Sequence, residues 1–125
     1  METIDISIAE LWDKYTILII KQSKINDIQK LIYINKELDL LNNKMNKYDY
    51  INNSLYTSLK EINTRLWNIE DLIRKKEYKK EFDQEFIQLA RKVYILNDER
   101  ANCKNKINKN FKSDLLEIKQ YINYV

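Results

Sequence analysis

The stretch from Ile51 to Ile73 reads INNSLYTSLKEINTRLWNIEDLI and carries the clearest helical pattern of the chain. Its apolar residues follow one another at intervals of three or four, at Ile51, Leu55, Leu59, Ile62, Leu66, Ile69 and Ile73. Such a stripe occupies one face of an α-helix, because the helix repeats about every 3.6 residues. The spacing predicts a helix from about Ile51 to Tyr78.

The segment before it carries a second stripe of the same kind. Its apolar residues are Leu31, Ile34, Leu38, Leu41, Met45 and Tyr48. Asp27 is the expected N-cap of a helix from about Ile28 to Lys47. Two consecutive seams joined around Asp49 predict an antiparallel hairpin of these two helices, with knobs-into-holes packing.

Two further helices are expected outside this pair. Ser7 and Glu10 form a capping-box pattern that predicts a helix from Ile8 to Lys24, so apolar around its circumference that it should be the most buried element. Asp83 predicts a helix from Gln84 to Asn110, and Ser113 or Asp114 a short one that ends at Val125. We therefore expect one all-α domain over residues 1–125. It would be a mainly antiparallel helical bundle of four long helices plus a short C-terminal helix.

The composition favours the same class and excludes several functions. The 125 residues include no glycine and no proline, which supply most left-handed turns and helix breaks. The chain has no histidine and only one cysteine, Cys103, so it lacks the common ligands of zinc and haem and any Ser–His or Cys–His arrangement. We expect no metal and no cofactor. An internal disulfide is excluded.

Charge and hydropathy narrow the expected partners. The net charge of +3 comes from 22 basic and 19 acidic residues, a near balance that argues against nucleic acid. The N-terminus has no signal-peptide pattern, and no apolar run reaches the length of a membrane span. We expect a cytoplasmic protein with no nucleic-acid and no membrane partner.

The helix expected from Gln84 to Asn110 breaks its own apolar pattern. Asn97, Arg100, Lys104 and Asn108 fall inside the apolar arc of this helix. A buried charge without a partner is costly, so each cation needs a carboxylate, a bound anion or water.

Three interpretations of these inward cations stay open. In an internal network, Asp13 and Glu70 neutralise Arg100 and Lys104. In a binding site, Arg100 and Lys104 hold an anionic group, Asn97 orients it, and Trp67 or Tyr94 stacks on it. In the third, the helix is frayed or exposed past Arg100 and the anomaly has no meaning. The candidate polar cluster comprises Asp13, Trp67, Glu70, Arg74, Tyr94, Asn97, Arg100 and Lys104.

Several of these segments resemble a known family. They are ISIAELWDKYTILIIK (6–21), LWNIEDLIR (66–74), FIQLARKVYILNDERANCKNKIN (86–108) and the terminal EIKQYINYV. The chain resembles a domain-of-unknown-function family of small helical proteins from bacteria, phages and large viruses. The resemblance implies one helical domain and brings no established activity with it.

The sequence therefore leaves two functions open. The first is a non-catalytic protein-interaction or assembly module, whose partner is another protein or a second copy of the chain. The alternative is a binding protein or small enzyme for an anionic metabolite or sugar phosphate at the internal Arg/Lys/Glu cluster. The spacing of residues leaves both open, and with them the question of catalysis.

Overall fold

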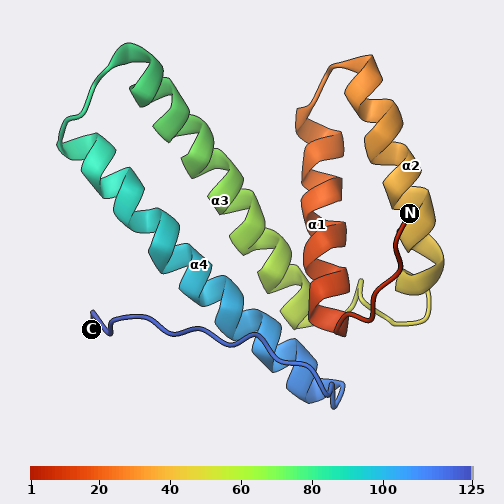
Figure 1. The fold of residues 1–125 in the computed structure, drawn as a ribbon. Coiled ribbons are helices and arrows are strands. Elements are labelled where there is room, and N and C mark those ends of the chain that lie inside the picture. The colour runs from red at the N-terminus through yellow and green to blue at the C-terminus, as the bar shows by residue number, and fades with distance from the viewer. Residues whose placement is uncertain (125) are drawn as a thin grey trace.

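The computed structural model describes residues 1–124 and confirms an all-helical chain with four long helices (Figure 1). They are α1 (Ile8–Lys24), α2 (Ile28–Met45), α3 (Ser54–Lys79) and α4 (Gln84–Asn110). The bounds of α1 and α4 agree with the prediction. The second helix ends at Met45 rather than Lys47, and the third begins at Ser54 rather than Ile51.

Polar side chains begin all four helices. The predicted caps are confirmed: Ser7 accepts a hydrogen bond from the Glu10 amide, Asp27 from two amides of α2, and Asp83 from the Phe86 amide. Each satisfies a backbone donor that the first turn leaves without a partner. At the end of α3, Lys80 adopts the left-handed conformation (φ 56°) that glycine usually takes at this position.

The predicted hairpin of the second and third helices is wrong. Within residues 1–124, α1 packs against α2 and α3 packs against α4, whereas α2 and α3 make no close backbone contact. The connections explain this arrangement: three residues join α1 to α2 and four join α3 to α4, but eight separate α2 from α3. Short connections force consecutive helices to lie antiparallel and adjacent.

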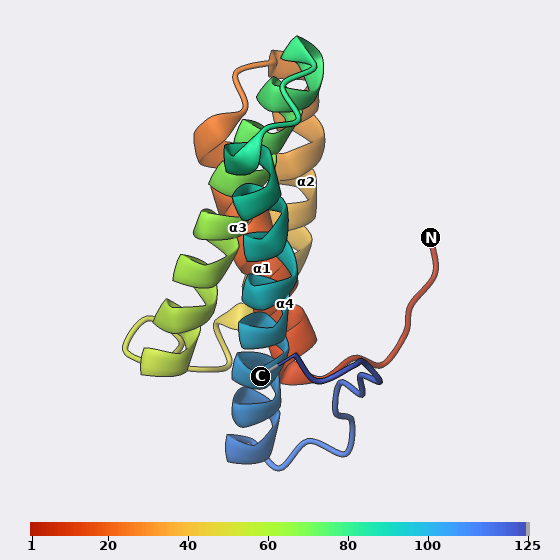
Figure 2. The ribbon, with the colours of Figure 1, turned by 90° about the vertical axis from the view of Figure 1, so that its left-hand side faces the viewer.

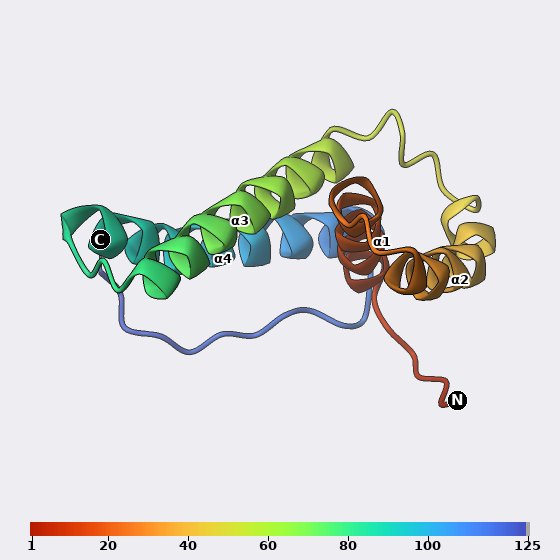
Figure 3. The ribbon, with the colours of Figure 1, turned by 90° about the horizontal axis from the view of Figure 1, so that it is seen from above.

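The two hairpins meet at one end and diverge toward the other. Helix α1 contacts both α3 and α4, and these contacts lie where α1 begins and α4 ends (Figure 1). Seen from above, α3 and α4 extend away from the α1/α2 pair (Figure 3). The arrangement is therefore open, with a V-shaped outline rather than a closed bundle.

The predicted C-terminal helix is also wrong. Residues 114–124 form no helix; they run back along α4, while Val125 lies outside the described residues. The side chain of Asn105 bonds to both main-chain polar groups of Glu117, which a helix would have used internally. A helix of this length is marginal without packing support, so these contacts outweigh it.

The main core lies where the hairpins meet, and α1 contributes most to it. Eight of the 17 residues of α1 are buried, against seven of 27 in α4, which confirms α1 as the most buried element. Trp12 is fully buried and packs edge-on against Tyr56 and Phe111, with ring centroids 5.6 and 5.3 Å away. A smaller core of Leu66, Ile69, Leu89 and Leu96 holds the α3/α4 hairpin together.

Removing the Trp12 ring should test this core directly. Trp12→Ala is expected to lower the free energy of unfolding by about 3–5 kcal/mol, because it leaves a large cavity among packed rings. The measurement is urea unfolding followed by circular dichroism. Tyr33→Ala, at an exposed position of α2, should change the value by no more than about 0.5 kcal/mol. A Trp12→Ala loss no larger than the Tyr33→Ala loss would contradict this placement of the core.

A cluster of tyrosines next to Trp12 should make stability depend on alkaline pH. Burial, together with a hydrogen bond and the charge of Tyr50, raises the pKa of Tyr15 to about 12, and burial also raises the pKa of Tyr56. The folded state therefore holds these protons more tightly than the unfolded chain, in which tyrosine has a pKa of about 10.

The resulting stabilisation is complete below the unfolded-state tyrosine pKa of about 10. It is lost as the pH rises through the raised pKa values of Tyr15 and Tyr56 in the folded state. We expect the free energy of unfolding, measured with urea at several pH values, to fall from pH about 10 upward. Tyr56→Phe should flatten this decline, and Tyr33→Phe should leave it unchanged. An equal slope for Tyr56→Phe and the wild type would contradict the prediction.

Candidate functional site

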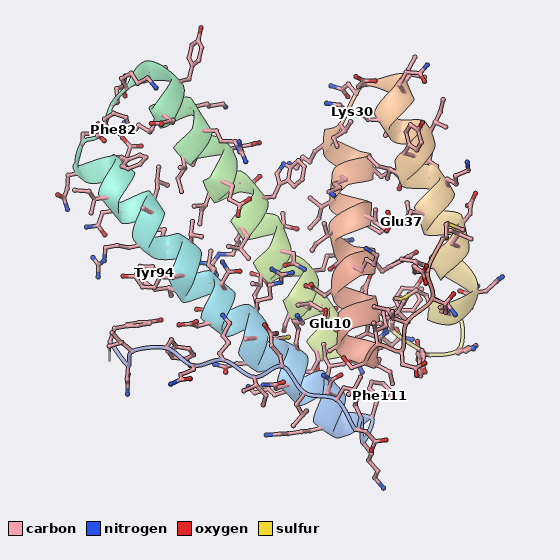
Figure 4. All side chains as sticks on the ribbon, viewed as in Figure 1. Glu10, Lys30, Glu37, Phe82, Tyr94 and Phe111 are labelled. Carbon is pink, nitrogen blue, oxygen red and sulfur yellow. The ribbon has the colours of Figure 1, made fainter. Side chains whose placement is uncertain are left out.

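A ladder of polar contacts joins α1 to α4 where the two hairpins meet. Asp13, Glu10 and the Ala9 amide on α1 face Arg100, Lys104 and Asn108 on α4 in antiparallel order. Glu10 marks the place of the ladder in Figure 4. We call these contacts the α1–α4 ladder.

The first rung is an ion pair between buried Asp13 and half-buried Arg100. Asp13 is 5% exposed, and its carboxylate accepts hydrogen bonds from Nε of Arg100 at 2.9 Å and from Nη2 of the same guanidinium. Asn63 on α3 donates to the same carboxylate at 2.9 Å and to the Thr16 hydroxyl at 2.9 Å. Hydrogen bonding to Asp13 outweighs burial and raises the pKa of Arg100. Three helices thus share one satisfied polar cluster.

The second rung places Lys104 between carboxylates. Its side chain is 7% exposed, and Nζ lies 2.7 Å from Glu10, 3.0 Å from Glu117 and 4.0 Å from Asp13. Burial lowers the pKa of Lys104, but the contacts with Glu10 and Glu117 outweigh it, so the net pKa is raised. The ammonium therefore stays charged inside the protein.

The third rung caps a helix. Asn108 is almost fully buried, and its side-chain oxygen accepts a hydrogen bond of 3.0 Å from the Ala9 amide in the first turn of α1. This amide has no partner within its own helix. The inward position of Asn108 is thus explained by the end of a neighbouring helix.

Beside the ladder lies a cleft between α1 and the α3/α4 hairpin, with a volume of about 210 Å³. Ile17, Ile20, Leu66 and Trp67 supply its apolar walls. Asn63, Asn97 and Arg100 add polar groups to the lining of the cleft. Lys21 of α1 and Glu70 of α3 also line it. Arg100 is held in place by Asp13, so its orientation in the cleft is set before anything binds.

Comparison with known protein families shows which family the chain belongs to. A family model described as "Family of unknown function (DUF6165)" matches residues 2–125. The chain belongs to this family. The predicted resemblance to a domain-of-unknown-function family is confirmed, whereas neither the curated proteins nor the solved structures yield a match.

In this DUF6165 chain, half of the candidate cluster comes together in the cleft. Trp67, Glu70, Asn97 and Arg100 all line it. Asp13 binds Arg100 from the α1 side, and Lys104 lies further along α4, outside the cleft lining.

The remaining two candidates lie elsewhere. Arg74 is exposed, and Tyr94 packs against Tyr124 of the C-terminal segment, with ring centroids 5.4 Å apart (Figure 4). The frayed-helix interpretation is wrong, because α4 continues to Asn110 and Lys104 is buried. The internal network is present with Asp13 as expected, but Glu10 and Glu117 take the place of Glu70.

The expected cluster omitted Glu10, Lys21 and Glu117. Glu10 had a usable signal, because Glu10 and Asp13 are one turn apart on α1, as Arg100 and Lys104 are on α4. Glu117 had none, since its position depends on the extended path of the C-terminal segment.

The described residues were also compared with the requirements of a metal site and of a membrane-spanning helix. Among residues 1–124, no three acidic or cysteine side chains come together in an arrangement that could hold a metal ion. None of the four described helices combines the length and the apolar character needed to cross a bilayer.

Breaking the first rung should cost stability. Arg100→Ala leaves the Asp13 carboxylate buried without its cation, and we expect the free energy of unfolding to fall by about 3–5 kcal/mol. Urea unfolding measures the loss, with Arg91→Ala as the matched control because Arg91 is exposed and, among residues 1–124, bonds only to Gln88 on the same helix. Asp13→Asn combined with Arg100→Ala should regain part of the loss, since no charge is then left unpaired. An Arg100→Ala variant as stable as Arg91→Ala would contradict the structural role of the rung.

Proposed function

We propose that the protein is a non-catalytic assembly module, a single helical domain that forms a homodimer through the cleft between its hairpins. The observation that carries this proposal is the amount of exposed surface. The chain exposes 9280 Å², whereas a compact monomer of 15.3 kDa exposes about 7,100 Å². The excess is therefore about 2,200 Å².

This excess is large on the scale of protein interfaces. A standard interface removes about 800 Å² from each partner, so covering less than half of the excess would be enough. Part of it comes from the terminal segments, which extend beyond the helices on one side of the molecule (Figure 2). The hairpins also diverge, which leaves the cleft between them open (Figure 1).

The cleft is better suited to a protein than to a small ligand. Its volume of about 210 Å³ lies below the range of about 300–1,000 Å³ typical of small-molecule sites. It is large enough for side chains inserted by a partner. Trp67 and Arg100 lie together in it, and tryptophan and arginine are the residues that most often dominate binding energy in protein interfaces.

The charges of the cleft favour a second copy as the partner. Lys21 on α1 and Glu70 on α3 form no ion pair within residues 1–124, and they carry opposite charges in one cleft. In a twofold interface the same surface of the two copies meets. If one residue of the first copy contacts a second residue of the other copy, the reverse contact forms as well. Lys21 of each copy would then pair with Glu70 of the other.

The alternative of an anionic metabolite or sugar phosphate has weaker support. Arg100 and Lys104 already have carboxylate partners in Asp13, Glu10 and Glu117. An anion that enters the cleft would have to compete with Asp13 for Arg100. The same competition opposes a catalytic role for this guanidinium.

Light scattering across a micromolar concentration series tests the assembly. We expect a dimer for the wild type and a monomer for Trp67→Glu, because the new charge would be buried in the interface. Tyr78→Glu lies on the same helix at a fully solvated position and should remain dimeric. A wild-type chain that stays monomeric refutes the proposal, and a thermal-shift response of that monomer to sugar phosphates would support the alternative.

Charge reversal tests the proposed pairing. Lys21→Glu alone and Glu70→Lys alone should each weaken self-association by about tenfold or more, because like charges then face each other. An equimolar mixture of these two variants should associate as strongly as the wild type, since every contact across the interface is again between opposite charges. A mixture that remains monomeric while the wild type dimerises would place the interface elsewhere.

A further inference from the structure

The C-terminal segment occupies a defined position on α4. After α4, Lys112 adopts a left-handed conformation (φ 53°) and the chain reverses direction. Residues 113–124, which we call the C-terminal strap, then return along α4 toward its middle (Figure 1). The strap lies extended, so its main-chain groups are available to side chains of α4.

One side chain of α4 binds the main chain of the strap. Nδ2 of Asn105 donates to the carbonyl of Glu117 at 3.1 Å, and the amide of Glu117 donates to Oδ1 of Asn105 at 3.0 Å. The asparagine amide thus satisfies both main-chain groups of one residue. This pattern requires an extended peptide, because a helix would have used both groups internally.

Neighbouring residues of α4 bind the side chains of the strap. Lys104 lies 3.0 Å from the Glu117 carboxylate. Asp98 accepts from Lys119 at 3.3 Å and from the Tyr124 hydroxyl at 2.9 Å. The helix therefore recognises a glutamate, a lysine two residues later and a tyrosine seven residues later.

Polar contacts rather than apolar burial hold the strap in place. Ile118 and Ile122 of the strap are 85% and 90% exposed, and its leucines are about half exposed. An incoming peptide with the same polar pattern could form the same hydrogen bonds, and little buried apolar surface would be lost when the strap leaves.

Departure of the strap would leave specific groups without partners. Lys104 would keep Glu10 as its one close carboxylate, and both polar atoms of the Asn105 side chain would lose their bonds. An occupant must therefore supply a carboxylate together with a main-chain amide and carbonyl. A free carboxylic acid or phosphate has only the first of these.

From this geometry we infer that the face of α4 formed by Asp98, Lys104 and Asn105 is a binding site for an extended segment of another protein that carries a glutamate followed two residues later by a lysine. The strap occupies this site in the free chain and competes with the incoming segment. The inference is separate from the proposed dimer, whose residues Lys21, Trp67 and Glu70 belong to the cleft.

The test uses a fluorescent synthetic peptide of residues 113–124 and fluorescence anisotropy with the full-length chain. Glu117→Lys should weaken the chain's own strap through repulsion from Lys104 and leave the site on α4 intact. We expect this variant to bind the peptide about tenfold more tightly than the wild type. Exposed Glu99 provides the control: Glu99→Lys makes the same charge change on α4 and should bind like the wild type.

Two further changes test the recognition itself. Replacing the glutamate of the peptide by glutamine, or adding Asn105→Ala to the Glu117→Lys chain, should each weaken binding about tenfold. All variants are also made with Trp67→Glu, the change expected to give a monomer, so self-association through the cleft cannot affect the result, and circular dichroism confirms that each is folded. Equal binding by the wild type and Glu117→Lys, or indifference to Asn105→Ala, would overturn the inference.

Discussion

The buried charges of the α1–α4 ladder are the constraint on which the rest of the structure depends. Asp13 and Arg100 are worth little as a source of stability, because the desolvation of both groups offsets their attraction. They are decisive for register. A shift of α1 along α4 by one turn would leave either the Asp13 carboxylate or the Arg100 guanidinium without its partner, which costs about 3–5 kcal/mol. The ladder therefore sets how the two hairpins meet.

Both proposed sites follow from this one junction. Asp13 fixes Arg100 in the lining of the cleft, and Glu10 holds Lys104 where Glu117 of the strap contacts it. Because each cation already has a carboxylate partner, neither is available as a simple anion trap. Two cations held in fixed positions suit a protein interface, because charges at an interface favour partners of complementary charge. The side chains of such a partner also supply hydrogen-bonding groups of their own. We therefore propose protein recognition rather than a small metabolite for both surfaces.

Local features could be predicted well, whereas nonlocal pairings could be predicted only in part, as for Asp13 with Arg100. The caps Ser7, Asp27 and Asp83 act within one turn of the residue that they serve, so their pattern is visible in the chain. An apolar stripe shows that a helix has a partner but not which one, and the stripes of α2 and α3 therefore suggested the wrong hairpin. For the candidate site, the inward cations of α4 were visible as breaks in the stripe. Glu117 was not, because the strap reaches it by an extended path.

The amino-acid sequence by itself determined that the chain is helical, where three of its four long helices begin, and that α4 turns Asn97, Arg100, Lys104 and Asn108 inward. These properties depend on hydrogen bonds and side-chain periodicity within a few residues. Only the tertiary structure decided that the hairpins diverge, that Glu10 and Glu117 rather than Glu70 neutralise Lys104, and that the last residues form a strap instead of a helix. These outcomes depend on competition between distant groups for the same buried partners, and that competition is settled only when the helices pack.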